Sequence, residues 1–419
     1  MLKIADGRGE VVQMQPYLNH ESEEIQQKAI YLLGQMRDTL AAPMLLPFLQ
    51  NTSNNVRVET IFALGQIGPA RVADSLIAHW QDETDLEAKQ AILEAVGKIG
   101  DSTHVGFLRQ GLAEPTPILK QTAAVALGQL AYWKRIDVSE AVDDFAALLD
   151  DDLNEIRWRA AWALMRIADS SAYDYLLIAS KDSDPRVRMQ CARGLGRTKV
   201  ASAVDRLAQM AKADPDWRVR ATAASAIGQL ELDEYLSKLP LEDENEHVRL
   251  SACNALANIA EQRFQKMHKD QQKALVAFLE NRLLSDVKAS LTWRERAAFT
   301  NAYASTLKGN AIDKLRTLTG DPNPLFRARL VDAFGKTKSQ LAVNDLFAFY
   351  KAGPMNVKIA VVGVLQDFKG GVANRIVLDA LEENDPVLTA QATRFLARDS
   401  LLGLRFDKND AVDGIGNTV

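Results

Sequence analysis

The chain has 419 residues, 47% of them hydrophobic and 25% charged, which is ordinary for a folded protein with a substantial core. Its formal net charge of −5 gives no overall attraction to nucleic acid or to an anionic membrane. Two cysteines, Cys191 and Cys253, exclude a disulfide framework and form no zinc-ligand pattern, and no apolar run reaches the roughly 18 residues of a membrane span.

The predicted elements repeat one pattern from the N-terminus onward. An apolar or small residue, numbered zero here, precedes a basic residue and then Ala-Leu-Gly or a close variant, as in Val56-Arg57 through Gly65. Position zero falls in chain order at Ile25, Val56, Ala88, Leu119, Ile156, Val187, Val219, Val248, Trp293, Phe326, Val357 and Val387. Most steps are about 29 to 33 residues, which indicates a repeat array, and the two longer ones place extra segments near 131–152 and 261–292.

Each copy predicts a helix that we call B. A Ser, Thr, Asp or Asn three residues before position zero suits a helix N-cap, with Leu153 and Pro354 as exceptions and with Ser290 and Asn384 as the caps of repeats nine and twelve. Apolar or small residues at zero, +4, +8 and +11 form a helical stripe. Glycine recurs at +9, where it costs about 1 kcal/mol relative to alanine, so we expect close contact between neighbouring B helices.

A second apolar helical stretch, A, precedes each B helix, as at residues 42–49 and 203–210. The predicted fold is therefore all-α, a right-handed α-solenoid of about twelve helix pairs with the B helices on the concave side. We expect one solenoid over residues 1–402 and a tail or linker to a further domain at 403–419.

The repeats resemble HEAT repeats of the short kind, over about residues 12–400. Residues 92–98, 157–166 and 216–220 also resemble the HEAT region of bacterial proteins that carry a cyclophilin-type peptidyl-prolyl isomerase domain. That resemblance implies a scaffold that precedes an isomerase domain in an exported, periplasmic protein; without it the expected compartment is the cytoplasm. The chain contains neither the Phe-His-Arg-Val-Ile nor the Gln-Gly-Gly element of a cyclophilin core, so no catalytic residue is carried over.

The basic residue at +1 has two interpretations. It recurs as Arg57, Lys89, Lys120, Arg157, Arg188, Arg220, Arg249, Arg294, Arg327 and Lys358. It could form a stripe for nucleic-acid phosphates, or it could pair with the capping Asp or Asn of its own or the next repeat. We expect the second, a ladder of ion pairs along the stack, because the residue recurs in nearly every repeat of an acidic protein.

Positions +2, +3, +6 and +10 lie outside the apolar stripe and are expected on the concave surface. Aromatic residues occupy +6 in four repeats: Tyr31, Phe62, Trp162 and Phe299. The densest group lies in repeats five and six and comprises Trp158, Arg159, Trp162, Arg166, Met189, Arg193 and Arg197. Aromatic and Arg side chains are typical of binding hot spots. The alternative is that one of the two tryptophans is buried against residues 131–134.

These patterns predict a non-catalytic scaffold that binds a peptide or protein partner on its concave face, with the substrate-binding arm of a peptidyl-prolyl isomerase as a narrower form. The five histidines are scattered, and no catalytic constellation, metal site or cofactor motif is predicted. The alternative is a nucleic-acid-binding or lyase-type helical-repeat enzyme that uses concave-face Trp and Arg residues. The net charge of −5 makes nucleic acid the weaker expectation.

Overall fold

A computed structural model describes residues 1, 10–230, 236–284 and 291–401, so the predicted tail at 403–419 and the predicted cap Ser290 lie outside the described residues. Within these ranges every regular element is a helix and no strand occurs. Contacts divide the chain into two compact units, residues 1–210 and 211–419, and each is described by itself.

In the first unit, short α-helices and 3₁₀ turns (η) of type A alternate with longer B helices. The A elements are η2 (Val11–Met14), α1 (Gln15–Leu18), η3 (Thr39–Ala41), α3 (Ala42–Leu45), η4 (Leu46–Gln50), α5 (Ala70–Trp80), η5 (Ser102–His104), α7 (Val105–Leu112), η6 (Ser139–Ala141), α9 (Val142–Leu148), η7 (Ser170–Ala172) and α11 (Tyr173–Ala179). The B helices are α2 (Glu23–Met36), α4 (Asn54–Ile67), α6 (Leu86–Ile99), α8 (Pro117–Trp133), α10 (Asn154–Ile167) and α12 (Pro185–Arg197). Helix α13 (Ala203–Ala213) is the next A helix and contains the boundary between the units.

The second unit continues the same alternation. Its A elements are η8 (Leu236–Lys238), η9 (Phe264–Lys266), α16 (Lys269–Leu284), η11 (Lys308–Ala311), α18 (Ile312–Thr317), η12 (Gln340–Ala342), α20 (Val343–Ala352) and α22 (Gly371–Glu382), and η13 (Leu365–Asp367) continues the B helix of repeat eleven. Its B helices are α14 (Trp217–Ile227), α15 (Glu246–Arg263), α17 (Trp293–Leu307), α19 (Pro324–Thr337), α21 (Met355–Val364) and α23 (Pro386–Leu401). The predicted all-α array of helix pairs is confirmed.

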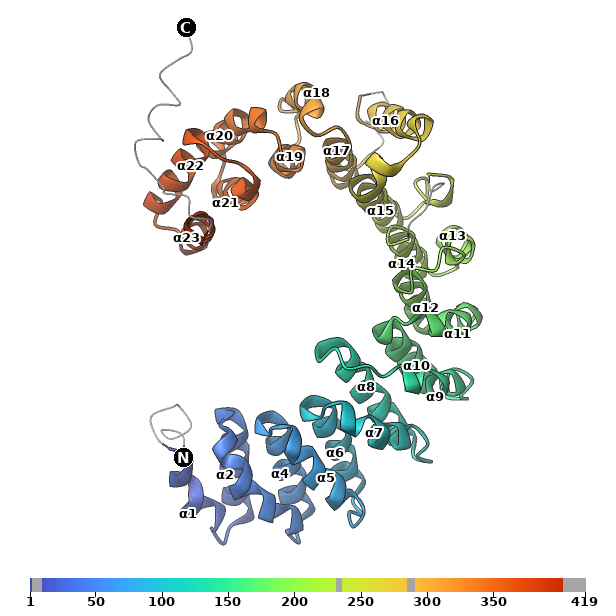
Figure 1. Ribbon diagram of the computed structural model, residues 1–419, viewed down its shortest axis with the longest axis vertical. Helices are drawn as coiled ribbons and strands as arrows, with labels where there is room; N and C mark the ends of the chain where they lie inside the picture. The colour runs from blue at the N-terminus through green and yellow to red at the C-terminus, as the bar shows by residue number, and fades with distance from the viewer. Residues whose placement is uncertain (2–9, 231–235, 285–290, 402–419) are drawn as a thin grey trace. The chain divides into compact units, whose positions relative to one another are not determined.

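Within each unit, every B helix packs on the B helix of the next repeat. Contacts run from α2 through α4, α6, α8 and α10 to α12, and from α14 through α15, α17, α19 and α21 to α23, as Figure 1 shows. The apolar stripes meet in these contacts: Val56, Leu127 and Leu164 are fully or almost fully buried. The apolar face of each repeat is thus buried by the neighbouring repeats, because a single repeat cannot bury it by itself.

Most predicted N-caps are confirmed. Asp85, for example, accepts a hydrogen bond from the backbone N–H of Ala88 at 2.9 Å. Repeat nine differs, because α17 begins after Thr292, which forms a capping box with Glu295. Position zero is therefore Glu295 and not Trp293, and the predicted register was wrong by two residues.

The predicted register of repeat twelve was wrong by one residue. Asp385 accepts hydrogen bonds from the backbone N–H groups of Val387 and Leu388, and so it caps α23 in place of the predicted Asn384. Leu388 is fully buried whereas Val387 is 53% exposed, so position zero is Leu388.

The glycines at +9 allow the close contact that their recurrence predicts. A Cβ atom added at Gly97 would lie 2.7 Å from the Cβ of Ala126 and 2.8 Å from its Cα. Gly65 and Gly228 face Ala95 and Ala255 in the same way, at 2.8 Å. A methyl group at these positions would force the B helices apart, so glycine sets their spacing.

Most of the basic residues at +1 form the predicted ladder, although Lys89 instead lies over the ring of Trp80, and the carboxylate partner is not the capping residue. It is the acidic residue two positions before the N-cap of the next repeat. The pairs are Arg57–Glu83 at 2.8 Å, Lys120–Asp151 at 3.4 Å, Arg157–Asp182 at 2.7 Å, Arg220–Asp243 at 2.8 Å, and Arg296–Asp321 and Lys358–Glu383. Arg249 instead pairs with Glu295 at 2.7 Å. In repeat nine the ladder residue is Arg296, and the predicted Arg294 is half exposed and paired with Glu246.

Candidate functional site

Helix α8 is longer than its neighbours. It spans 17 residues, whereas α6 and α10 span 14 each. Its end is fixed by a hydrogen bond from the N–H of Ile136 to the carbonyl oxygen of Leu130 and by the left-handed conformation of Arg135, an arrangement typical of helix C-termini. The ammonium group of Lys134 also donates to the carbonyl oxygen of Gly100 at 2.6 Å. The extra turn therefore holds Tyr132 and Trp133 in defined positions.

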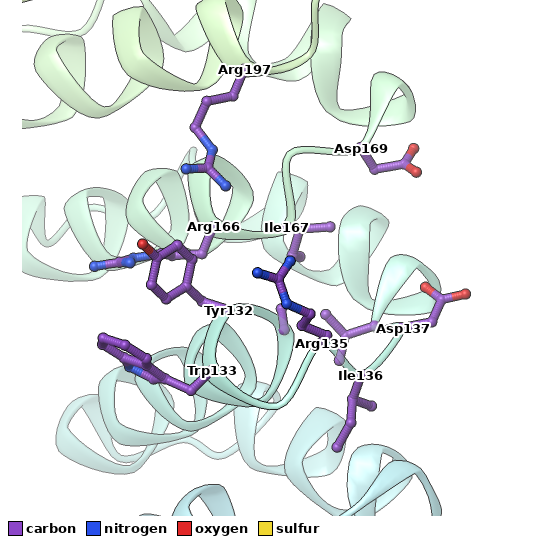
Figure 2. A pocket seen from close by; sticks show the side chains of 11 residues that line it. Tyr132, Trp133, Arg135, Ile136, Asp137, Arg166, Ile167, Asp169 and Arg197 are labelled. Atoms are coloured by element: carbon purple, nitrogen blue, oxygen red, sulfur yellow. The ribbon is translucent and has the colours of Figure 1, made fainter. Parts of the chain in front are cut away.

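Beside this extra turn lies a pocket of about 530 Å³, which we call the Tyr132 pocket. It is lined by side chains from the end of α8, from the segment that follows it, and from the ends of α10 and α12 (Figure 2). Its main residues are Tyr132, Trp133, Arg135, Asp137, Arg166, Asp169 and Arg197. Trp133 is 73% exposed and Tyr132 is 37% exposed, so two large aromatic side chains border the pocket in contact with solvent.

Two guanidinium groups stack on the rings of this region. The guanidinium carbon of Arg166 lies 4.0 Å from the ring centre of Tyr132 and 5.0 Å from that of Trp162. The guanidinium carbon of Arg197 lies 5.7 Å from the same ring centre of Tyr132. The Nε atoms of Arg166 and Arg197 are buried without a hydrogen-bond partner in the described part of the chain. Stacking on the rings therefore orients both guanidinium groups and leaves their Nη–H donors available to a ligand.

The positive charge in the pocket is not neutralised by contact. Among the described residues, Arg135, Arg166 and Arg197 form no ion pair, and in Figure 2 the carboxylates of Asp137 and Asp169 point away from them. Both carboxylates cap the turns that follow, since Asp137 accepts from the N–H of Ser139 and Asp169 from that of Ser171. Hydrogen bonds from the hydroxyl and the backbone N–H of Ser171 lower the pKa of Asp169. The pocket thus presents three cations and exposed aromatic rings, which suits an anionic ligand with apolar parts.

The structure places the predicted site residues of α10 in two groups. Trp162 packs over Gly128 of α8, where an added Cβ would lie 2.5 Å from the indole ring, and its ring contacts Arg166 at the edge of the Tyr132 pocket. Trp158 lies one turn earlier and stacks with the guanidinium groups of Arg159 and Arg186, at 4.9 and 5.8 Å.

The other predicted residues are dispersed. Arg193 is exposed on α12 and donates to the side-chain oxygen of Gln190, and Met189 is half-buried on the same helix. Tyr31 on α2 and Phe62 on α4 are exposed, with Lys28 and Lys98 over their rings. Phe299 does not belong to the surface, because the corrected register places it at +4, where it is 1% exposed.

Sequence reasoning missed Tyr132, Trp133 and Arg135 as site residues. The signal that could have found them is the absence of a helix-ending residue after Gly128, since Gln129-Leu130-Ala131-Tyr132-Trp133 contains neither Gly nor Pro. Of the predicted residues, the structure brings Trp162, Arg166 and Arg197 together with these three.

The described residues contain neither a grouped set of metal ligands nor a membrane-spanning helix. No group of three or more His, Cys, Asp or Glu side chains there is placed to hold a metal ion. None of the helices in the described ranges has the length and apolar character to cross a membrane.

Comparison with known families finds HEAT repeats. A family model of HEAT repeats matches residues 13–97, 105–179 and 176–240, together more than half of the chain, and a single HEAT repeat matches residues 234–263. No curated protein matches the chain.

Three solved structures show how far the similarity of fold extends. The Kap95:Nup1 complex contains a chain with 15% identity and a TM-score of 0.62, over 97% of this chain and 64% of that one. Kap95p bound to RanGDP gives 14% identity and a TM-score of 0.56, over 96% and 62%. Importin beta gives 13% identity and a TM-score of 0.54, over 96% and 61%. The chain thus spans less than two thirds of each, and at these identities the similarity shows the fold alone.

Proposed function

The chain belongs to the HEAT-repeat family, and we propose that it is a protein-binding scaffold whose Tyr132 pocket receives an acidic, extended segment of a partner protein. The solved chains of similar fold include one in complex with a protein, Nup1, which supports a protein partner for this chain as well. The charge and the aromatic side chains around the pocket support an acidic segment as the part of the partner that is bound.

One observation carries the proposal: three arginines, Arg135, Arg166 and Arg197, line the pocket without an ion pair among the described residues. In the ladder, by contrast, the guanidinium groups of Arg57, Arg157 and Arg220 are each paired with a carboxylate. An Asp or Glu side chain of a partner would accept hydrogen bonds from the free Nη donors of Arg166 and Arg197. Apolar side chains next to it would pack on Trp133 and Tyr132.

Single-stranded nucleic acid is the competing ligand, since phosphates and bases also suit Arg groups and aromatic rings. The charge distribution favours the peptide. A nucleic acid carries a phosphate at every nucleotide and is repelled by a chain with a net charge of −5, whereas a short acidic segment engages the local cations alone.

The test uses random dodecapeptides displayed on phage, selected against the purified full chain, and measures binding of the enriched peptides by fluorescence anisotropy. Arg166→Gln combined with Arg197→Gln removes two of the cations. The matched control is Arg71→Gln combined with Lys199→Gln, because both residues are exposed in the same unit and the net charge changes equally.

We expect enrichment of peptides that contain Asp or Glu beside aromatic or aliphatic residues, and a loss of affinity of about tenfold or more in the pocket variant only. Equal loss in the control variant, or no acidic enrichment, would overturn the proposal. Tighter binding of a dT₂₀ oligonucleotide than of any enriched peptide, with a steep dependence on salt, would replace it by nucleic-acid binding.

The resemblance to the HEAT region of cyclophilin-type isomerases supports a narrower form, in which the bound segment belongs to an unfolded client chain. This form predicts that the protein binds a reduced, permanently unfolded client more tightly than the same client in its native state. Equal affinity for the two states would exclude the narrower form and leave the acidic-segment proposal in place.

A further inference from the structure

The ladder has a constant geometry that makes an interruption recognisable. In a complete step, the Nη1 atom of the +1 arginine donates to carbonyl oxygens of the turn in its own repeat, as Arg157 does to Asp151 at 2.9 Å. The Nε and Nη2 atoms donate to the carboxylate of the next repeat, at 2.7 and 3.1 Å for Arg157 and Asp182. Arg220 repeats this arrangement with Asp243 at 2.8 and 3.1 Å.

Between repeats ten and eleven the step is incomplete. Arg327 makes the first contact, from Nη1 to the carbonyl oxygen of Asp321. The residue two positions before the N-cap of repeat eleven is Ala352, where most other repeats carry Asp or Glu. The N-cap is Pro354, which gives α21 no side-chain cap. The Nε–Nη2 edge of Arg327 thus has no carboxylate among the described residues, and the first turn of α21 has no capping oxygen.

A pocket of about 550 Å³ lies at this interruption, and we call it the Arg327 pocket. Its lining is mainly apolar and comes from α19, α20 and α21, with Leu325, Arg327, Phe349, Ala352, Pro354 and Val357 among its residues. Asp345 also lines it, but both of its oxygens already accept from Arg316, at 3.1 and 3.0 Å. Leu325 is 53% exposed at the border of the pocket. An arginine without a carboxylate therefore lies in an apolar pocket that is open to solvent.

We propose that the Arg327 pocket binds a second peptide segment, in which one Asp or Glu is flanked by large apolar residues. The carboxylate takes the place of the absent ladder acid and accepts from Nε and Nη2 of Arg327, while the flanking side chains fill the space beside Phe349, Val357 and Leu325. The argument is charge complementarity: this protein completes the same guanidinium edge with its own carboxylate in other repeats. The site lies in the second unit and does not depend on the function proposed for the Tyr132 pocket.

The probe is a pool of fluorescein-labelled pentapeptides with a central Asp flanked by Leu, Ile, Val, Phe or Met, and the control pool has a central Asn. Binding is measured on the full chain that carries Arg166→Gln and Arg197→Gln, so that the Tyr132 pocket does not contribute. Ala352→Asp places a carboxylate at the ladder position, and the exposed Ala352 leaves room for it. Arg327→Gln removes the guanidinium group, and Arg329→Gln on the same helix is the matched control.

We expect the Asp pool to bind about tenfold more tightly than the Asn pool, because the guanidinium–carboxylate contact supplies that difference. Ala352→Asp should abolish the preference and raise the melting temperature, whereas Ala352→Asn should do neither. Arg327→Gln should also abolish the preference, and Arg329→Gln should keep it. Equal binding of the two pools, or an unchanged preference in Ala352→Asp, overturns the proposal.

Discussion

Arg57 and Glu83 lie 26 residues apart, in different repeats, and the guanidinium group of Arg57 donates to both carboxylate oxygens of Glu83, at 2.8 and 2.9 Å. The side chain of Glu83 is 1% exposed. Its carboxylate also accepts from the backbone N–H groups of Thr84 and Asp85 at 2.9 Å and contacts Nε2 of His79 at 3.0 Å. One carboxylate therefore joins two repeats and orders the turn between its own A and B helices.

This arrangement predicts a pH-dependent contribution to stability. Burial by itself raises the pKa of Glu83, but the hydrogen bonds from Arg57, Asp85 and His79 outweigh it and bring the pKa from its usual 4.5 down to about 2. Because the folded-state pKa is the lower one, the contribution is complete above pH 4.5 and is lost as the pH falls toward 2.

The measurement is urea unfolding of the wild-type chain and of Glu83→Gln at a series of pH values. We expect the variant to be less stable by about 3 kcal/mol at pH 7, since it leaves Arg57 buried beside a neutral group. The difference between the two proteins should shrink between pH 4.5 and 2. A difference that stays constant across this range contradicts the assignment.

The close contact of the B helices predicts opposite effects for one substitution at two glycines. Gly97→Ala places a methyl group 2.7 Å from Ala126 and should destabilise the chain by about 1–3 kcal/mol. Gly106→Ala, in α7, meets nothing within 4 Å and should stabilise it by up to about 1 kcal/mol. Thermal unfolding monitored by circular dichroism measures both, and effects of the same sign would contradict the close-contact account.

The corrected register of repeat nine predicts a large difference between two neighbouring arginines. Arg296 is 9% exposed and pairs with the fully buried carboxylate of Asp321, so Arg296→Met should cost about 3 kcal/mol. The side chain of Arg294 is 53% exposed, and Arg294→Met should cost less than about 0.5 kcal/mol. Chemical denaturation distinguishes the two, and similar costs would favour the register with Trp293 at position zero.

The repeats could be predicted from the sequence because each position has its own physical requirement: a cap, an apolar stripe, a glycine at a close contact. Repeat nine was misplaced because Trp293-Arg294 has the apolar–basic sequence expected at positions zero and +1. These positions are in fact occupied by Glu295 and Arg296. Thr292-x-x-Glu295 is a capping-box signature that would have given the correct start. In repeat twelve, Asp385 before Pro386 carried the corresponding signal, since proline favours the first turn of a helix.

The candidate site could be predicted only in part. Arg166 and Arg197 follow from their shared position at +10, because the period alone places equivalent residues of adjacent helices side by side. Tyr132 and Arg135 do not follow, because they lie where α8 departs from the period and no repeat provides a template for them. The interruption at Arg327 could not be recognised either until the ladder acid was located two residues before the cap.

The ladder also has a consequence for how such a chain can change in length. Each complete step of the ladder joins a basic side chain of one repeat to a carboxylate that precedes the B helix of the next repeat. The same contact can therefore form between any two repeats that carry these residues. Deletion or duplication of one whole period brings an equivalent cation opposite an equivalent anion and leaves the array continuous. A gain or loss of two or three residues inside a B helix would instead misalign the charges and the glycine contacts at once, so this architecture favours evolution by whole repeats.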